Sequence, residues 1–385
     1  MNANRLAVNI LFFINGFLYG NWVSRIPYIQ EIYGLDNSTL GLILLCMSIG
    51  AVVSMPVAGL LISRLGSHQV ATVCAILFLL IIPFIPVASN LIVLGIIYFL
   101  MGSFTGMKDV AMNAQAVLVE QQLKKPIMSS FHAIWSAGMM LGAGAGAIYT
   151  RYHVDLFPHL LSVVIPCGVL LLWAIKHLIV DEVSPTAPGE GGFRWPNRSL
   201  VGLSLVVFCS MLGEGAMADW STNYLEKEVK ASPSLAPIGL AAFSMAMMFG
   251  RFIGDWLRSN FGDYKLLITS SLIALTGIGI SLSILSPYTA IGGFFLVGIG
   301  LATIVPIAFS RAGSLPGIKP GLGISMVTTI GYAGFLFGPP IIGFLADWQS
   351  LRSALTFIAL LFLIMTILSA SLSISMTRKN KLEAS

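Results

Sequence analysis

The sequence has 385 residues, of which 56% are hydrophobic and only 10% are charged. Soluble domains are usually about 25% charged, so this composition excludes an ordinary soluble protein and indicates a polytopic membrane protein. The net charge of +5 does not point to nucleic acid, because no run of Lys and Arg is interleaved with aromatic residues. The four cysteines lie in apolar runs without CxxC spacing, which argues against a disulfide framework or a zinc site.

Twelve apolar runs approach the length of about 20 residues that a membrane-spanning helix needs. The sequence therefore predicts an all-α integral membrane fold with twelve transmembrane helices. The first run is not followed by a cleavage site of small residues, so we expect it to be retained as an anchor. The runs cover residues 7–29, 39–63, 70–88, 91–119, 129–150, 157–180, 199–224, 237–257, 264–285, 288–310, 321–346 and 351–375.

A polar break divides these runs into two blocks of six. Residues 181–198 are rich in Pro, Gly and Glu, which is typical of a flexible linker. We expect an N-terminal six-helix bundle at 1–180, a cytoplasmic linker at 181–198, a C-terminal six-helix bundle at 199–376 and a cytoplasmic tail at 377–385.

The distribution of basic residues predicts the orientation of the chain. With the N-terminus inside, Lys and Arg are roughly three times as frequent on the inner side as on the outer side. We therefore expect a multi-pass protein of the bacterial inner membrane with both termini in the cytoplasm.

Three short motifs recur in the same order in both blocks, at separations of 196 to 198 residues. Such repeats predict two pseudo-symmetric bundles, a plan that secondary transporters use with a binding site at the repeat interface. The matches are Asn21-Trp22 with Asp219-Trp220, Phe99-Leu-Met-Gly102 with Phe295-Leu-Val-Gly298, and Ala137-Gly138 with Ala333-Gly334.

The connection between the second and third runs resembles a motif of the major facilitator superfamily, Gly-x-x-x-Asp-Arg-x-Gly. The segment Gly59-Leu-Leu-Ile-Ser-Arg-Leu-Gly66 keeps both glycines and Arg64, but Ser63 replaces the acid. In the family this motif is a cytoplasmic latch made of charge pairs. The departure at Ser63 puts a latch in the first half in doubt.

A second copy, Gly250-Arg-Phe-Ile-Gly-Asp-Trp-Leu-Arg258, keeps the acid as Asp255. The resemblance implies a cytoplasmic latch in which Asp255 pairs with Arg251 or Arg258. It covers essentially the whole chain and implies the major facilitator fold, in which helices 1, 4, 7 and 10 line a central cavity and helices 2, 5, 8 and 11 flank it. It also implies a monomer that works by alternating access.

Two further stretches are similar to a bacterial subgroup of this superfamily that includes a rhizopine (amino-inositol) transport protein. They are Asp109-Val-Ala-Met-Asn-Ala-Gln115 and Ser130-Phe-His-Ala-Ile-Trp-Ser-Ala-Gly138. The resemblance implies a small polar solute of the sugar or amino-polyol type.

The fourth run carries ionisable residues, which are unfavourable in hydrocarbon. Asp109 and Asn113 are four residues apart and share a helix face. Apolar surroundings favour the protonated carboxyl, so Asp109 is a candidate for proton coupling. A structural salt bridge or a polar clamp between the fourth and fifth helices is the alternative. Lys108 points about 100° away, and we expect it to balance a carboxylate on another helix or to extend toward the interface.

The fifth run places His132, Trp135 and Met139 on one stripe. Histidine titrates near physiological pH, so His132 is a candidate proton or substrate ligand, and the alternative is a hydrogen bond between helices. Trp135 either stacks on a sugar-like ring or fills volume.

The seventh run contains two acids, Glu214 near its middle and Asp219 about a turn and a half further out. Glu214 is the second candidate for proton coupling. Asp219 is expected to pair with Arg25, as an outer gate or as a structural tie.

Substrate-binding residues are expected in the first and eleventh helices as well. Asn15, Tyr19 and Trp22 recur at spacings of four and three residues and so form one stripe, while Tyr332 is a weaker candidate. Asn113 and Trp135 complete the predicted substrate site.

The sequence therefore predicts a secondary active transporter for a small polar solute, with protons and the lipid bilayer as its other partners. The alternatives are a proton-driven exporter of drugs or metabolites and, more remotely, a membrane sensor that does not transport. Walker A, HExxH and Gly-x-Ser-x-Gly motifs are absent from the sequence, so neither an enzyme nor a bound cofactor or metal is expected.

Overall fold

The computed structural model describes residues 3–124, 127–180, 198–313 and 320–383, which are almost entirely helical. Within these ranges twelve helices are long and apolar enough to cross a membrane, as predicted. The first half contains α1 (Ala3–Val23), α2 (Ile26–Tyr33), α3 (Asn37–Leu65), α4 (Ser67–Ile81), the 3₁₀ helix η1 (Ile82–Val87), α5 (Leu91–Leu123), α6 (Met128–Arg151) and α7 (Leu156–Ile175). The second half contains α8 (Arg198–Asn223), the π-helical turn η2 (Tyr224–Glu228), α9 (Ala236–Phe261), α10 (Asp263–Ser283), α11 (Pro287–Leu301), α12 (Ile304–Gly313), α13 (Pro320–Trp348) and α14 (Leu351–Glu383).

Several boundaries differ from the sequence prediction; the tenth run, for example, predicted as one helix over 288–310, is divided into α11 and α12. The first run, predicted as one helix over 7–29, is divided into α1 and α2, and Pro27 stands in the first turn of α2, where its missing N–H is tolerated. The predicted linker lies outside the described residues except for Arg198, at which α8 begins. Helix α14 continues to Glu383 through most of the predicted tail, because residues 377–383 contain neither Pro nor Gly.

The repeated Phe-Leu-x-Gly motif marks equivalent helix contacts in the two halves. A Cβ atom on Gly102 of α5 would lie 1.9 Å from the carbonyl oxygen of Met47 in α3. A Cβ atom on Gly298 of α11 would lie 2.4 Å from the carbonyl oxygen of Phe243 in α9. Small residues let membrane helices approach backbone to backbone, so each half uses the same position to bring two helices together.

The Ala-Gly repeat marks a second pair of equivalent contacts. The Cβ position of Gly138 in α6 lies 2.4 Å from the carbonyl oxygen of Phe13 in α1. The Cβ position of Gly334 in α13 lies 2.7 Å from the carbonyl oxygen of Phe208 in α8. The sequence repeat therefore corresponds to a repeat in helix packing, as the two-bundle fold predicts.

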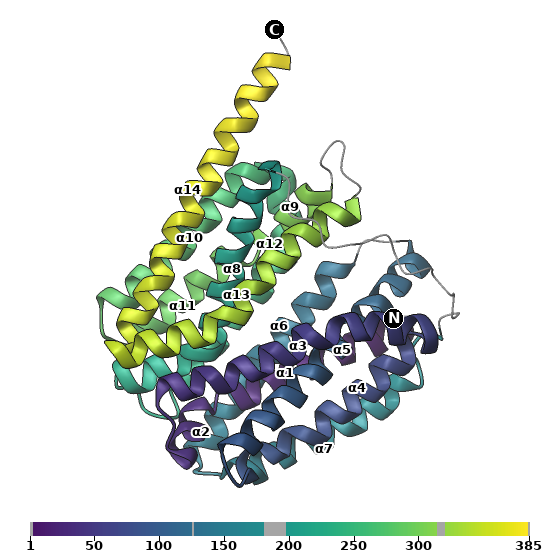
Figure 1. The fold of residues 1–385 in the computed structure, drawn as a ribbon, viewed down its shortest axis with the longest axis vertical. Helices are drawn as coiled ribbons and strands as arrows, with labels where there is room; N and C mark the ends of the chain where they lie inside the picture. The colour runs from purple at the N-terminus through teal and green to yellow at the C-terminus, as the bar shows by residue number, and fades with distance from the viewer. Residues whose placement is uncertain (1–2, 125–126, 181–197, 314–319, 384–385) are drawn as a thin grey trace.

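The two halves approach each other at one end of the molecule and diverge at the other. Figure 1 shows them close together around α2 and separating toward the end that carries both termini. We call these the α2 end and the termini end. The contacts between the halves come chiefly from α6 packed on α9 and from α3 packed on α13.

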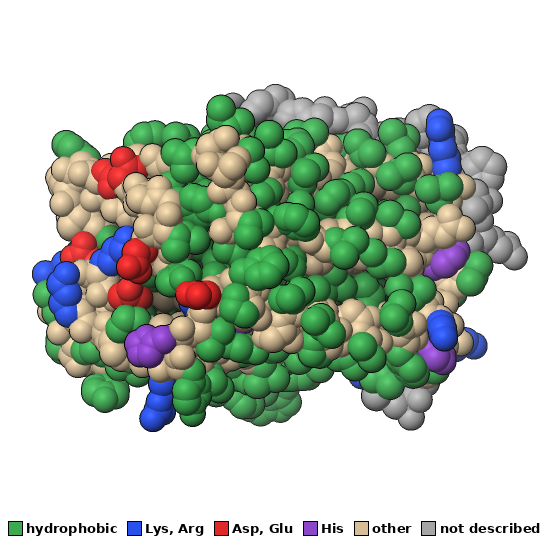
Figure 2. Space-filling model, turned by 90° about the horizontal axis from the view of Figure 1, so that it is seen from below, with side chains coloured by type: hydrophobic (Ala, Val, Ile, Leu, Met, Phe, Trp, Pro, Cys, Tyr) green, Lys and Arg blue, Asp and Glu red, His purple; other side chains and the backbone are tan. Residues whose placement is uncertain are grey.

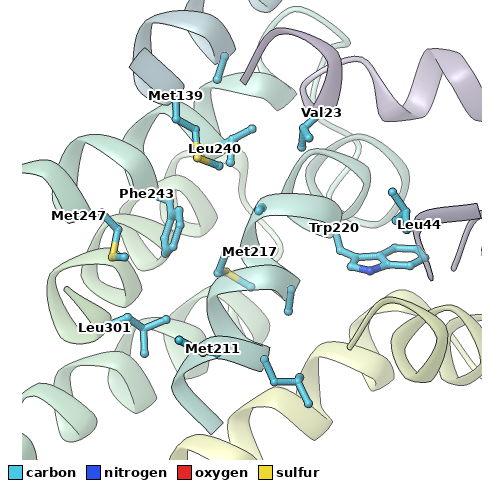
Figure 3. Packing of buried hydrophobic residues seen from close by; sticks show 14 of the residues in the cluster. Val23, Leu44, Met139, Met211, Met217, Trp220, Leu240, Phe243, Met247 and Leu301 are labelled. Atoms are coloured by element: carbon cyan, nitrogen blue, oxygen red, sulfur yellow. The ribbon is translucent and has the colours of Figure 1, made fainter. Parts of the chain in front are cut away.

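Buried apolar side chains from both halves meet in this interface. Figure 3 shows Met139 of α6 beside Leu240 of α9, and Leu44 of α3 on the side of Trp220 in α8. The outer surface is also apolar: Figure 2 shows one face covered by hydrophobic side chains, with most charged groups toward its two ends. Such a band is suited to lipid, and its members include Ile92 and Val169, which are 76% and 65% exposed.

Candidate functional site

A cavity of about 290 Å³ lies between the two halves. Its wall takes side chains from α1, α3, α5 and α6 of the first half and from α8, α9 and α13 of the second. The three residues predicted for proton coupling, Asp109, His132 and Glu214, lie on this wall. The structure also places on it the predicted substrate-binding residues Asn15, Tyr19, Trp22, Asn113, Trp135 and Tyr332.

In the first half, Asn15 connects two charged residues of α5. Its side-chain nitrogen donates to Oδ1 of Asp109 at 2.8 Å, and its Oδ1 accepts from Nζ of Lys108 at 2.7 Å. Lys108 is 2% exposed, and its Nζ lies 3.7 Å from the ring centroid of Phe78. Both contacts stabilise the buried cation. Lys108 and Asp109 are thus linked through the Asn15 amide, although they point to different faces of the helix.

Lys108 therefore lies behind the cavity wall, whereas Asp109 lies on it. Lys108 was expected either to pair with a carboxylate on another helix or to extend toward the membrane surface. Its contacts match neither expectation, because its hydrogen-bond partner is Asn15. Asn15 uses both ends of its amide in this link. Asn113 donates from Nδ2 to the backbone oxygen of Asp109 at 2.8 Å, which leaves its side-chain oxygen as an acceptor at the cavity.

Aromatic groups form another part of the wall. Tyr19 stands edge-on to Trp22, with ring centroids 5.2 Å apart, and is 6.2 Å from Trp135. His132 of α6 contacts the ring of Phe12 edge-on at 5.3 Å. Flat aromatic faces beside hydrogen-bonding groups are typical of sites for small polar molecules.

In the second half, Glu214 of α8 pairs with Arg251 of α9. Nη2 of Arg251 lies 3.0 Å from Oε1 of Glu214, and both side chains are 15% exposed. The other guanidinium nitrogen, Nη1, donates to the Ser136 hydroxyl of α6 at 2.8 Å. Arg251 therefore joins the two halves at the cavity, and the fork of its guanidinium allows it to bind both partners.

This position differs from the predicted cytoplasmic latch. The Arg251 side chain lies on the cavity wall, where it pairs with Glu214. Arg258 binds Asp263 and Ser310 within the second half. The side chain of Asp255 lies outside the described residues. Arg64 is exposed at the end of α3.

Asp219 contacts the other half through Tyr19. The Tyr19 hydroxyl donates to Oδ1 of Asp219 at 3.1 Å, and Asp219 is 7% exposed on the cavity wall. Among the residues that the structure describes, no cation forms an ion pair with Asp219.

The predicted pair between Arg25 and Asp219 is not formed. Arg25 lies in the turn between α1 and α2, where its Nη1 is 3.2 Å from Nδ1 of His159 and its Nη2 donates to the Val154 carbonyl at 2.9 Å. Burial lowers the pKa of the Arg25 guanidinium. The break after α1 turns this side chain toward α7, so Arg25 stabilises the first half internally.

A second cavity of about 330 Å³ adjoins the first. The two share His132, Glu214, Arg251, Tyr332 and Phe335, and the second extends to residues near the termini end of α6 and α9. The Arg251–Glu214 pair therefore lies where the two cavities meet.

Hydrogen bonds close the opposite, α2 end. Asp347 at the end of α13 accepts from the backbone nitrogens of Asn37 and Ser38, at 3.1 and 2.6 Å, and from Nδ2 of Asn37 at 2.9 Å. Its carboxylate thereby binds the N-terminus of α3, which favours negative charge. Nearby, Oε1 of Gln30 accepts from Asn223 and Lys227 of the second half. The cavity is thus closed at the α2 end and continues toward the termini end.

Several residues of the wall were not predicted from the sequence. Ser48 of α3 lines the cavity and donates to the Phe335 carbonyl of α13 at 3.2 Å. Thr105, Met47 and Phe243 also line it. A single hydroxyl or apolar residue within an apolar run does not indicate from sequence alone whether its side chain faces the cavity or the lipid. In the described part of the chain, no group of three or more His, Cys, Asp or Glu is arranged to hold a metal.

Comparisons with known proteins identify the family. The family model of the Major Facilitator Superfamily matches residues 8–201 and 203–383. The chain is 35% identical to an uncharacterized MFS-type transporter of Yersinia pestis over 94% of each chain. It is 33% identical to the membrane protein MosC of Rhizobium meliloti, over 91% of this chain and 86% of that protein.

More distant similarity extends to proteins with named sugars and to solved structures. A glucose/galactose transporter of Brucella abortus is 26% identical over 89% of this chain and 87% of its own. A crystal structure of a mutant of the nucleoside transporter NupG superposes with a TM-score of 0.78, covering 96% of this chain and 100% of that one. At 11% sequence identity, the NupG structure supports the fold alone.

Proposed function

This chain belongs to the major facilitator superfamily of membrane transporters, and from that premise we propose that it carries a small polar solute by alternating access. The solute is of the sugar or amino-polyol class, and the membrane is the bacterial inner membrane. Both termini lie in the cytoplasm, so the α2 end is the outer end and the arrangement described is open toward the cytoplasm. The protein works as a monomer of two six-helix bundles, 1–180 and 199–376.

The observation that carries this proposal is the chemistry of the cavity between the halves. Asn113, His132 and Trp135 offer hydrogen-bonding groups beside the aromatic faces of Tyr19 and Trp22. A ring bearing several hydroxyl groups needs such donors and acceptors together with flat apolar surfaces. The similarity to the Brucella glucose/galactose transporter supports the same class of solute.

We propose that transport is coupled to protons through the ionisable groups of the wall, with Asp109 and Glu214 as the leading sites and His132 as a third. Glu214 contacts a group whose surroundings change when the halves move, since Arg251 binds both Glu214 and Ser136. Asp109 lies on the same wall and is linked to Lys108 through Asn15. Coupling requires a group whose proton occupancy depends on the conformation.

A second candidate is a proton-driven exporter of drugs or metabolites. The second cavity, of about 330 Å³, favours it in one respect, because Met128, Met211, Phe309 and Phe335 give that space a partly apolar lining. Apolar walls that can repack are suited to loosely defined molecules.

Counterflow in proteoliposomes tests the transport proposal and separates the two candidates. Vesicles that contain the purified protein are loaded with an unlabelled compound. Uptake of the same compound in radiolabelled form is then measured for glucose, galactose, myo-inositol, glucosamine and ethidium. Exchange of a sugar or polyol supports the proposal, exchange of ethidium alone supports the exporter, and a lack of exchange with every sugar and polyol contradicts the proposed substrate class.

Coupling is tested with Asp109→Asn and Glu214→Gln in the same vesicles. We expect counterflow to persist and accumulation along a proton gradient to fall to the equilibrium level. If both variants still concentrate the solute, the assignment of these two sites is wrong.

A further inference from the structure

Asp219 differs from the other acids of the cavity wall in what surrounds it. Glu214 has the Arg251 guanidinium at 3.0 Å, and Asp109 is linked through Asn15 to Lys108. Within the described residues, the carboxylate of Asp219 has one hydrogen-bond donor, the Tyr19 hydroxyl at 3.1 Å, and no cation. A buried carboxylate with so little compensation is expensive to keep ionised.

The groups that face Asp219 across the cavity do not supply the missing charge. Arg25, the cation expected beside it, is held by His159 and the Val154 carbonyl. Arg251 is occupied by Glu214 and Ser136. The titratable and charged groups of this wall are Tyr19 from α1, Asp109 from α5, His132 from α6, Glu214 from α8, Arg251 from α9 and Tyr332 from α13.

The single donor to Asp219 comes from the opposite half of the protein. Tyr19 belongs to α1 and Asp219 to α8, so their hydrogen bond spans the interface that must separate when the α2 end opens. Asp347 and Gln30 hold the same end closed by bonds of their own. The Tyr19–Asp219 bond therefore exists only in arrangements in which the halves meet at this level.

We infer that Asp219 is a proton-binding site whose occupancy alternates with this bond: it takes up a proton when the halves part and releases it when Tyr19 returns. The inference rests on the proposed alternating access. A hydrogen bond to the ionised form stabilises that form, so the loss of the Tyr19 donor when the halves part favours the protonated form. No covalent bond changes: the proton is taken from water on the outer side and returned to water on the inner side.

Infrared difference spectroscopy on the full-length protein in lipid tests this, with protons as the probe. The difference between the spectra recorded in acidic and in alkaline buffer contains the carbonyl band of each carboxyl group that titrates over that pH range. The wild type is expected to show a band that is lost in Asp219→Asn. Glu31→Gln is the control, because Glu31 is an exposed carboxylate on α2, and this variant is expected to retain the Asp219 band.

Tyr19→Phe gives a second, independent outcome. Removing the donor destabilises the ionised carboxylate, so the midpoint of the Asp219 band is expected to rise by about one pH unit. An unchanged difference spectrum in Asp219→Asn, or a midpoint in Tyr19→Phe that stays the same or falls, would overturn the inference. Because protons alone are followed, the result does not depend on whether any solute of the counterflow panel is carried.

Discussion

The two halves share a packing plan and differ in how they hold their charges. Gly102 and Gly298 bring equivalent helices into backbone contact. In the first half, Lys108 and Asp109 are linked within that half through Asn15. In the second half, the charged residues of the cavity reach across, with Arg251 on Ser136 and Asp219 on Tyr19.

The difference assigns two roles to these contacts: those within a half stabilise the fold, and those between the halves belong to the proposed transport cycle. Equivalent glycine contacts bring helices together within each half, whereas under the proposed alternating access the polar contacts between the halves would break and re-form. We therefore expect substitutions in the first-half charge link to affect stability most, and substitutions at the contacts between halves to change the balance of conformations.

The largest expected effect is that of Lys108→Met. It leaves the half-buried Asp109 without its linked cation, and removing one partner of a largely buried charge link is destabilising by about 3 kcal/mol. The measurement is the free energy of unfolding in mixed micelles. Lys108→Met combined with Asp109→Asn should recover most of the loss. Arg251→Met should be milder, because Arg251 and Glu214 both face the cavity at 15% exposure.

A loss in the double variant equal to that of Lys108→Met alone would contradict the charge link. It would show that Lys108 stabilises the fold through its contact with Phe78 instead.

Next in size are the repeated glycines. Gly102→Ala and Gly298→Ala place a Cβ atom 1.9 and 2.4 Å from a backbone oxygen, so α3 and α9 must shift, at about 1–3 kcal/mol each. Gly144→Ala and Gly292→Ala are the matched controls, since beyond the adjacent backbone of their own helices no atom lies within 4 Å of either Cβ position. The controls should be neutral or stabilising by up to about 1 kcal/mol, because Ala favours the helix.

Unfolding of these four variants under one set of conditions makes the comparison. Similar losses at Gly102 and Gly298 support a shared packing plan. A loss of stability for only one of the two variants would contradict the shared packing plan.

The smallest effect is expected for Asp347→Asn at the exposed α2 end. It weakens the hold on the backbone of Asn37 and Ser38, and an exposed hydrogen bond to a charged group should shift the closed-to-open ratio by about two- to fivefold. Spin labels on Glu31→Cys and Gln349→Cys report it, since both positions are exposed and lie in opposite halves. The fraction of long distances should increase; an unchanged distribution would mean that Asp347 does not hold this end closed.

The sequence was sufficient for the fold, because hydropathy identifies each membrane-spanning helix separately. It also placed Asp109, Asn113, His132 and Trp135 on helices whose polar stripe the structure brings to one cavity. These inferences need only the helical period of a single segment.

The pairings between helices were less accessible to sequence reasoning. Arg25 was expected beside Asp219, but the break before Pro27 turns it toward His159. Arg251 or Arg258 was expected to pair with Asp255 in a cytoplasmic latch. Arg251 instead lies beside Glu214 at the cavity, and Arg258 binds Asp263. The rotation of one helix against another depends on tertiary packing, which a single sequence does not encode locally.

The most direct test of alternating access is a reversible lock on the α2 end. Asn37→Cys and Asp347→Cys are combined in a chain whose four native cysteines are replaced, because the Asn37 amide and the Asp347 carboxylate are 2.9 Å apart across the halves. Counterflow of the solute found in the panel is measured before oxidation, after oxidation and after reduction, with each single cysteine as a control. The account predicts that the disulfide abolishes exchange and that reduction restores it. Exchange at an undiminished rate in the fully cross-linked protein would contradict it.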